Sequence, residues 1–377
     1  MMNRPKKKLR KFLNILSMYK SSEKALTYPI AMQVEVTCGC NISCKMCVVP
    51  NLLTRKKGFM SFETFKNIYD QIKPDTVVLT GYGESLLNKD IFRIIEYAKK
   101  NNSSVHMDTN CTLLDESRSQ KLIVSGIDLV KVSIDGATKE TYDKIRLESN
   151  YDVLWENLRT FVRLKKEVGM ENPLLNLSCI IQPENFEELC SIVEAGYNLG
   201  KIDLRFGIVT DYGNNKEGTY NFWKDIDQKK VLDSFDVALK RSKELGLQST
   251  FSTLSGAKEQ YIELMRTKRL KMGACFWPWT SLFITSEGLI KPCCYFYDKD
   301  MVMGDLRKKK FKDIWNNYQY QLFRKNLVTN REVYPRCTVC GTDETHLFDK
   351  IDNSLKYVPF IKSEYKTLGN GNWQSKQ

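Results

Sequence analysis

The chain has 377 residues, of which 42% are hydrophobic and 27% charged, a composition that excludes global disorder. This length suggests two domains, with room for a small third module. The longest apolar runs, such as Phe12–Leu16, are too short to span a membrane, and no small-residue cleavage site indicates a secretory signal. We therefore expect a cytoplasmic protein.

The net charge of +13 is concentrated at the start of the chain. Residues 1–22 contain seven basic residues and no acidic ones, so the other 355 residues share a net charge of +6 (13 − 7). The body of the protein is therefore not predicted to bind nucleic acid. Apolar residues recur at helical spacing among the lysines: Leu9, Phe12, Leu13 and Leu16. This basic N-terminal arm, residues 1–28, either packs on the domain or contacts an anionic surface or an acidic carrier.

From residue 29 to residue 212, six predicted strands alternate with helical stretches. The strands are expected at 31–37, 76–80, 104–109, 129–135, 174–182 and 202–209. The helices are expected at 61–73 with Ser61 as N-cap, at 88–100 with Asn88 as cap, and at 113–125, 151–168 and 184–199. This alternation predicts an α/β fold with a parallel sheet. Polar residues at every second strand position favour a wet interior, as in an incomplete barrel rather than a closed one.

The rest of the chain divides into three parts. Residues 213–272 are polar and helical, most clearly at 231–245, and are predicted to form a helical spacer. Residues 273–346 are predicted to form a small cysteine-bearing module with a strand at 282–285 and a helix at 311–326. Residues 347–377 form a C-terminal tail without a readable metal motif.

Twelve cysteines are many for a chain in a reducing compartment, where grouped cysteines indicate metal binding more often than disulfides. The first group lies in the loop after the first strand. It contains Cys38, Cys40, Cys44 and Cys47. The spacing Cys40-x3-Cys44-x2-Cys47 provides three thiolates that can bind three irons of a [4Fe–4S] cluster and leave the fourth iron open. The alternative is a structural zinc held by all four cysteines.

Glycine-rich and polar segments follow the next strands. After the second strand comes Gly81–Glu84 (GYGE); its glycines let the backbone approach a ligand, and Glu84 can accept a hydrogen bond from an ammonium group. The third strand ends in Asp108–Asn110 and the fourth in Val132–Gly136 (VSIDG). Arg146 follows, and a guanidinium group suits a carboxylate. Because the C-terminal ends of parallel strands form one edge of a sheet, these segments are expected to lie together.

These motifs resemble those of the radical S-adenosylmethionine (SAM) superfamily, whose signature is CxxxCxxC after the first strand of a partial (β/α)6 barrel. The resemblance runs from about residue 29 to Cys340 and favours the cluster over zinc. It implies a [4Fe–4S] cluster on Cys40, Cys44 and Cys47 whose open iron binds SAM. The SAM-binding residues that it implies are Gly81, Gly83, Glu84, Asn110, Ser133, Asp135 and Arg146.

The second group of cysteines resembles the C-terminal SPASM and shorter twitch modules of the same superfamily. The spacing that carries this resemblance is Cys275-x12-Gly288-x4-Cys293, followed by Cys337-x2-Cys340. The later cysteines of a full SPASM module are missing, and His346 stands where the next would fall. Four thiolates saturate one auxiliary [4Fe–4S] cluster, as in the twitch module of the butirosin radical SAM dehydrogenase. Zinc at the same positions is the alternative.

The resemblance implies that SAM is cleaved reductively to a 5′-deoxyadenosyl radical, which takes a hydrogen atom from the substrate. The implied electron donor is a protein such as flavodoxin or ferredoxin. The charged interior and single auxiliary cluster favour oxidation or epimerisation of a small polar, sugar-like substrate; the alternative is radical modification of a peptide or protein. Candidate catalytic residues are Lys131, Arg205 and Cys294, the last of which is otherwise a spare core thiol. The SAM-site segments argue against a third hypothesis, a non-enzymatic iron–sulfur or zinc protein.

Overall fold

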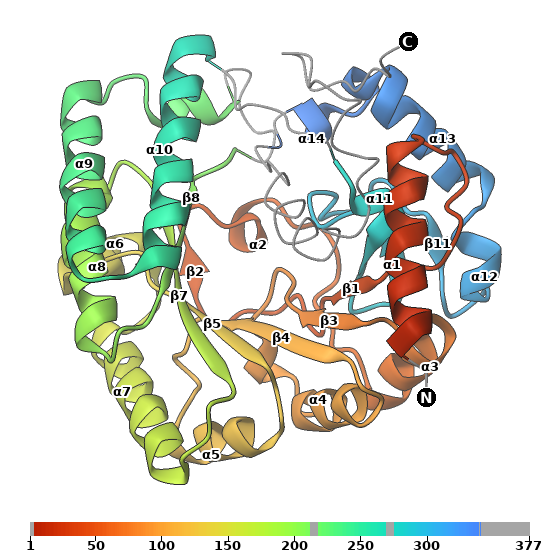
Figure 1. Cartoon of the computed structure of the whole chain (residues 1–377), viewed down its shortest axis with the longest axis horizontal. Helices are drawn as coiled ribbons and strands as arrows, with labels where there is room; N and C mark the ends of the chain where they lie inside the picture. Colours follow the sequence, from red (N-terminus) through yellow and green to blue (C-terminus); the bar gives the residue numbers. More distant parts are fainter. Residues whose placement is uncertain (1–3, 212–217, 269–274, 339, 341–377) are drawn as a thin grey trace.

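The computed structural model describes residues 4–211, 218–268, 275–338 and 340. Its centre is a set of parallel strands that lie side by side in chain order. They are β1 Ala31–Val34, β3 Thr76–Leu79, β4 Ser104–Thr109, β5 Leu129–Ser133, β7 Leu174–Ile181 and β8 Leu204–Ile208. Figure 1 shows these strands fanned in an arc, with helices along the outer side of the arc. The predicted α/β architecture with a parallel sheet is therefore confirmed.

Helices connect the strands and cover the outer face of the sheet (Figure 1). They are α3 Phe62–Ile72, α4 Ile91–Lys100, α5 Glu116–Val124, α6 Lys139–Ile145, α7 Tyr151–Val168, the short 3-10 turn η2 Phe186–Glu188 and α8 Leu189–Asn198. Ser61 caps α3 as predicted, because its hydroxyl accepts a hydrogen bond from the backbone N–H of Thr64. Asn88, in contrast, does not cap α4. Its amide donates to the backbone carbonyls of Val36 and Met60, which fixes the chain before the helix begins.

Alternation along the strands separates an apolar face from a polar face. In β4 and β5, the side chains of Val105, Met107 and Val130 are fully buried, whereas the polar residues between them are half-buried. Lys131 Nζ lies 2.7 Å from Asp108 Oδ1 across the two strands. The apolar face packs against the helices, so the polar side chains line the inner face, as the alternation predicted.

The C-terminal cysteine-bearing segment is continuous with this sheet and is not a separate layer. Strand β9 (Ser281–Ile284) pairs in parallel with β1, with Ala31 opposite Ser281. Strands β10 (Leu289–Lys291) and β11 (Gly304–Asp305) extend the same sheet in antiparallel fashion. The other elements of this segment are α11 Trp277–Thr280, α12 Phe311–Ile314, α13 Tyr318–Thr329, η4 Arg331–Val333 and α14 Pro335–Thr338. The helix expected at 311–326 is therefore interrupted, because Asn317 caps a new helix through the N–H of Tyr320.

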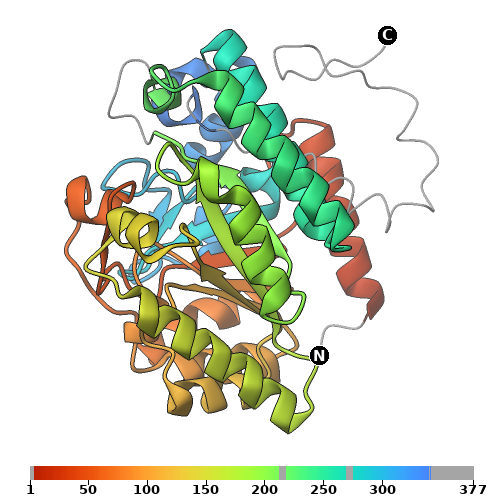
Figure 2. The same cartoon turned by 90° about the vertical axis from the view of Figure 1, so that its left-hand side faces the viewer.

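The segment expected to be a spacer is part of the barrel wall. Its elements are η3 Gly218–Phe222, α9 Gln228–Glu244 and α10 Gln248–Thr267. Both views show α9 and α10 side by side next to the last strand (Figures 1 and 2). The hydroxyl of Thr250 accepts a hydrogen bond from the backbone N–H of Leu204 at 2.8 Å, so α10 covers the edge of β8. Phe235, Leu254 and Tyr261 share an apolar cluster with β7, β8 and α8.

The N-terminal segment also belongs to the body. Helix α1 (Arg4–Tyr19) lies beside the C-terminal helices in Figure 1. The chain that follows is fixed by side chains of the C-terminal segment: the indole N–H of Trp279 donates to the carbonyl of Ser22, and that of Trp315 donates to the carbonyl of Thr27. Within the described residues, no helix is long and apolar enough to cross a membrane.

Candidate functional site

The three signature cysteines surround a cavity at the C-terminal ends of the strands. Their loop contains the short strand β2 (Ser43–Cys44) and the short helix α2 (Val48–Asn51). Strand β2 pairs with β6 (Arg146–Leu147), which places Cys44 opposite Arg146. Cys40, Cys44 and Cys47 all line the cavity, which has a volume of about 320 Å³.

Most of the predicted SAM-site residues line the same cavity. They are Gly81, Gly83, Glu84, Asn110, Ser133 and Arg146. The seventh, Asp135, is fully buried behind Arg146 and does not line the cavity. An apolar side of the cavity was not predicted from the sequence; it is formed by Ile42, Met46, Val48, Ile180, Ile208 and Val209. These apolar residues could not be identified as cavity-lining from the sequence, because apolar residues are equally expected in a buried core.

The glycine-rich loop lies directly against the cysteine loop. A Cβ atom on Gly83 would lie 2.4 Å from the carbonyl oxygen of Gly39 and 2.5 Å from that of Thr37. The backbone N–H of Glu84 donates to the same Gly39 carbonyl at 2.9 Å. A Cβ on Gly81 would meet the side chain of Glu35 at 2.4 Å. The glycines therefore allow two backbones to touch at the cavity floor.

We expect Gly83→Ala to lower the free energy of unfolding by about 1–3 kcal/mol, because the added methyl group must displace backbone rather than a flexible side chain. The iron content after anaerobic reconstitution should fall with it, since the displaced loop carries Cys40 and Cys44. Gly39→Ala is the matched control, because its Cβ would meet only the Thr37 hydroxyl at 3.5 Å. Equal losses of iron and stability in both variants, measured by metal analysis and urea unfolding, would contradict the contact argument.

Glu84 connects the glycine-rich loop to the end of strand β4 by hydrogen bonds. Its carboxylate accepts hydrogen bonds from the Thr109 hydroxyl at 2.8 Å, from the Asn110 N–H at 2.7 Å and from the Leu86 N–H at 3.0 Å. Burial raises the pKa of Glu84, and these hydrogen bonds oppose the shift. A carboxylate has about four acceptor positions, so capacity is left for one more donor in the cavity.

Arg146 connects the cavity to a buried carboxylate. Its Nε donates to Asp135 Oδ2 at 2.9 Å, and its Nη2 lies 2.7 Å from the same oxygen. The other Asp135 oxygen accepts from the N–H of Ile180 at 2.8 Å. The remaining guanidinium nitrogen, Nη1, donates to Cys44 Sγ at 3.7 Å. The negative charges of Asp135 and of the Cys44 thiolate raise the pKa of Arg146 against the effect of burial.

The thiols of this loop are suited to a bound cationic cluster. Burial raises the pKa of Cys44 to about 11, and the charge of Arg146 opposes the shift. Cysteine binds metal as thiolate, so a positively charged group in the cavity would offset the cost of ionising these buried thiols. No three Cys, His, Asp or Glu side chains of the described residues are grouped so that they could hold a single metal ion. Thiols distributed around a cavity fit a larger iron–sulfur cluster.

Cys38 does not join the other three. Its side chain is fully buried, and its thiol donates to the carbonyl of Lys56 at 3.5 Å and accepts from the Ser286 hydroxyl at 3.8 Å. It does not line the cavity. A zinc site formed by all four cysteines is therefore not assembled in this structure.

The second group of cysteines comes together around Cys293. Burial raises the pKa of the Cys293 thiol, and the neighbouring thiols of Cys294, Cys275, Cys337 and Cys340 raise it further. The structure thus gathers four side chains from both ends of the C-terminal segment, as an auxiliary cluster requires. No disulfide joins them. His346, the extra candidate ligand, lies outside the described residues.

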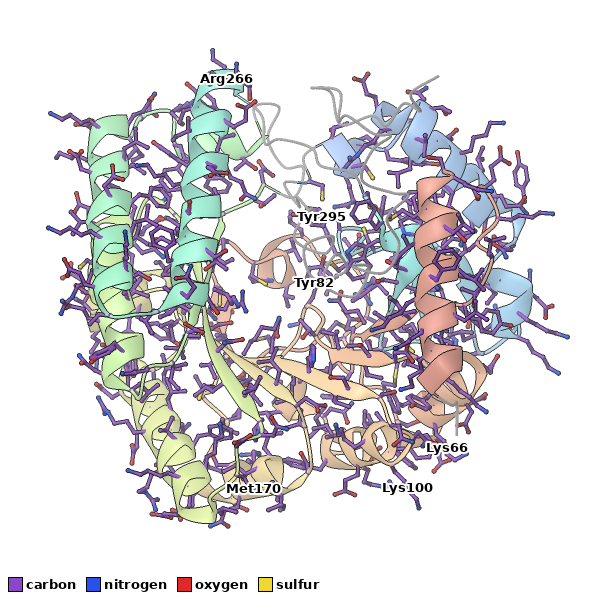
Figure 3. All side chains as sticks on the ribbon, viewed as in Figure 1. Lys66, Tyr82, Lys100, Met170, Arg266 and Tyr295 are labelled. Atoms are coloured by element: carbon purple, nitrogen blue, oxygen red, sulfur yellow. The ribbon has the colours of Figure 1, made fainter. Side chains whose placement is uncertain are left out.

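Tyr82 joins the two cysteine sites. Its side chain lines the cavity, and its hydroxyl donates to the backbone carbonyl of Cys294, the residue after Cys293. Its ring packs edge-on against Phe283 and Tyr297, with centroid distances of 6.2 Å and 5.8 Å. Figure 3 shows Tyr82 beside Tyr295 at the centre of the molecule. In the sequence, the Tyr between two glycines gave no indication of this contact.

A buried ion pair also links the cysteine loop to the C-terminal segment, and the sequence did not reveal it. Arg55, which follows the loop, makes two hydrogen bonds to the fully buried Glu35 carboxylate at 2.9 and 2.8 Å. Its Nε donates to the carbonyl of Tyr297 at 2.6 Å. Glu35 also accepts a hydrogen bond from the N–H of Ser286 at 3.1 Å. This network therefore joins the segments on either side of the cysteine loop to the C-terminal segment.

The three candidate catalytic residues do not line the cavity. Lys131 lies deeper on the inner face and pairs with Asp108. Arg205 lies on β8, opposite Ser178 of β7. The backbone carbonyl of Cys294 accepts a hydrogen bond from Tyr82, and its thiol lies close enough to act on the Cys293 thiol.

Comparisons with known proteins match the parallel-sheet part and the C-terminal cysteine-bearing segment separately. The model of the radical SAM superfamily matches residues 34–195, and that of the SPASM iron–sulfur cluster-binding domain matches residues 275–341. The AdoMet-dependent heme synthase of Methanosarcina barkeri is 26% identical over 326 residues, which cover 81% of this chain and 86% of that protein. The tungsten-containing aldehyde ferredoxin oxidoreductase cofactor-modifying protein of Pyrococcus furiosus is 23% identical over 333 residues, covering 82% and 86%.

A solved structure shares the fold at lower sequence identity. Streptococcus suis SuiB, bound to its precursor peptide SuiA, superimposes with a TM-score of 0.62 at 16% identity. The match covers 91% of this chain and 77% of SuiB. The fold is therefore shared over most of this chain.

Proposed function

Because this chain belongs to the radical SAM superfamily and carries a C-terminal SPASM domain, we propose that it modifies a peptide or protein substrate by removing a hydrogen atom. As a member of that family it binds a [4Fe–4S] cluster and SAM, and its SPASM domain binds auxiliary iron–sulfur. The observation that carries the proposal is that three thiols, the glycine-rich loop and Arg146 all line the same cavity. The bound cluster and SAM would supply a radical able to take hydrogen from an unactivated C–H bond.

The residues around the cavity have separable tasks in this proposal. Cys40, Cys44 and Cys47 hold the cluster, and Arg146 stabilises the Cys44 thiolate. The Glu84 carboxylate would accept a hydrogen bond from the ammonium group of bound SAM. The apolar side of the cavity would exclude water, which would protect a reactive species formed there from side reactions.

The C-terminal cysteines would hold the auxiliary cluster. Cys275, Cys293, Cys337 and Cys340 lie beyond Tyr82 from the cavity, so a substrate near the Tyr82 ring would lie between the two sites. An auxiliary cluster in this position can accept the second electron of an oxidation. A reduced flavodoxin or ferredoxin in the cytoplasm would supply the first.

The peptide substrate class is supported by the likeness to SuiB, which was solved with a precursor peptide and matches 91% of this chain. A small polar, sugar-like substrate is the second candidate. It is favoured by the Lys131–Asp108 pair, whose side chains are 30% and 31% exposed on the inner face. Such a pair can bind hydroxyl groups without the cost of an unpaired buried charge.

The decisive experiment measures 5′-deoxyadenosine from the reconstituted full chain with SAM and dithionite. Peptides encoded beside the gene, and a panel of sugars and aminocyclitols, are supplied in deuterated form. We expect deuterium to appear in 5′-deoxyadenosine with a peptide, together with a mass change of that peptide. The same transfer from a sugar, with none from any peptide, would replace the proposed substrate class by the second candidate.

A further inference from the structure

Helix α1 turns a polar face towards the body of the protein. Arg10, Asn14 and Ser17 are 7%, 1% and 0% exposed. The Arg10 guanidinium donates to the backbone carbonyl of Lys73 at 2.8 Å and also to those of Tyr28 and Pro29. The Asn14 amide donates to the Tyr28 carbonyl at 3.0 Å. These buried hydrogen bonds fix the rotation of the helix about its axis.

The first half of the apolar stripe of α1 faces outwards, whereas Leu13 and Leu16 are half-buried. Leu9 and Phe12 are 56% and 38% exposed, and Lys8 and Lys11 are exposed beside them. A helix that served only to cover the core would bury this stripe and expose its polar residues. Helix α1 does bury Ile15 and Met18 in the core, but it leaves Leu9 and Phe12 available to an external partner.

A second basic group lies on the same side of the molecule as α1 (Figure 1). The turn before α12 and the helix itself expose four lysines: Lys308, Lys309, Lys310 and Lys312. The ring of Phe311 packs edge-on against Tyr28, with centroids 4.9 Å apart, and Tyr28 is the residue whose carbonyl binds Arg10 and Asn14. Figure 1 shows α1 and α12 on the same side of the molecule. Asp313 is the exposed acidic residue on α12.

We propose that this face, formed by the outward stripe of α1 and the lysines of 308–312, docks on an anionic lipid surface. Exposed leucine and phenylalanine between lysines are the composition of helices that lie in a membrane interface. The lysines are attracted by the negative surface potential, and the apolar side chains enter the acyl boundary. The face is the surface of a helix rather than a groove, which suits a fluid surface better than a folded acidic protein. The proposed enzyme would thereby work at the membrane without crossing it.

The test uses the purified full chain and co-sedimentation with vesicles that are either zwitterionic or contain about a third anionic lipid. We expect binding to the anionic vesicles at least about tenfold tighter than to the zwitterionic ones, and weaker binding as salt is raised. Lys8→Glu/Lys11→Glu should lower affinity for anionic vesicles by at least about tenfold. Leu9→Ser/Phe12→Ser should lower it several-fold at every salt concentration.

Matched control variants lie on α9, on the opposite side in Figure 1. Lys229→Glu/Lys230→Glu reverses two exposed lysines, and Val237→Ser removes a 56% exposed apolar side chain. Both controls should bind vesicles like the wild type, with circular dichroism and iron content checking the fold of every variant. Absence of binding to anionic vesicles, equal loss in the α9 controls, or binding to acidic peptides alone would overturn the proposal. SAM cleavage is measured separately, so a failure here leaves the proposed reaction untouched.

Discussion

Cys44→Ala is expected to reduce SAM cleavage to the background level and to remove about four irons and four sulfides per chain. Cys44 lines the cavity together with Cys40 and Cys47, and its thiol is the one that Arg146 contacts. With only two thiols left, the cubane cannot be held and SAM has no metal to bind. The measurements are 5′-deoxyadenosine formation and iron and sulfide content after anaerobic reconstitution.

Two other cysteine variants show whether the effect is specific. Cys190→Ala changes a half-buried thiol on α8, outside both cysteine groups, and should retain full cleavage and iron. Cys337→Ala should retain part of the cleavage, uncoupled from product, because Cys337 belongs to the group around Cys293 and not to the cavity. Equal loss of cleavage in Cys44→Ala and Cys337→Ala would mean that the auxiliary group is needed for the structure of the SAM site.

The sheet and the cysteine loop could be predicted because their signals are local in the sequence. Strands with polar residues at every second position, such as 104–109, indicated both the sheet and its wet inner face. The spacing of Cys40, Cys44 and Cys47 and the glycines of 81–84 identified the cavity, and the structure places all of these residues in it. The contact of Tyr82 with Cys294 was not predicted.

The parts that could not be predicted depend on contacts between distant segments. Strand β9 pairs with β1, and no local pattern specifies which edge a late strand will join. In the sequence, nothing distinguishes Glu35 and Arg55 from other charged residues. Their contacts with Ser286 and Tyr297 form only in the folded chain. For α1, the sequence left open which face is buried; Arg10 lies on the buried side because backbone carbonyls of other segments accept its hydrogen bonds.

Arg146→Met is expected to lower the free energy of unfolding by about 3–5 kcal/mol, because it leaves the fully buried Asp135 carboxylate without its cation. The same variant removes the N–H that points at Cys44 Sγ, so we also expect weaker SAM binding in any protein that still assembles the cluster. Urea unfolding measures the first effect, and the SAM concentration needed for half-maximal 5′-deoxyadenosine formation measures the second.

The double variant Arg146→Met/Asp135→Asn separates the two effects. Removing the carboxylate charge should restore much of the lost stability, since an unpaired buried charge costs more than a neutral amide. It should not restore SAM binding, because Cys44 still lacks its partner. Arg241→Met is the control for removing an arginine from an ion pair: its contact with Glu194 is exposed, and its loss should cost no more than about 1 kcal/mol. If the double variant recovered SAM binding together with stability, Arg146 would act only by keeping Asp135 paired, and its contact with the cysteine loop would have no role in holding SAM.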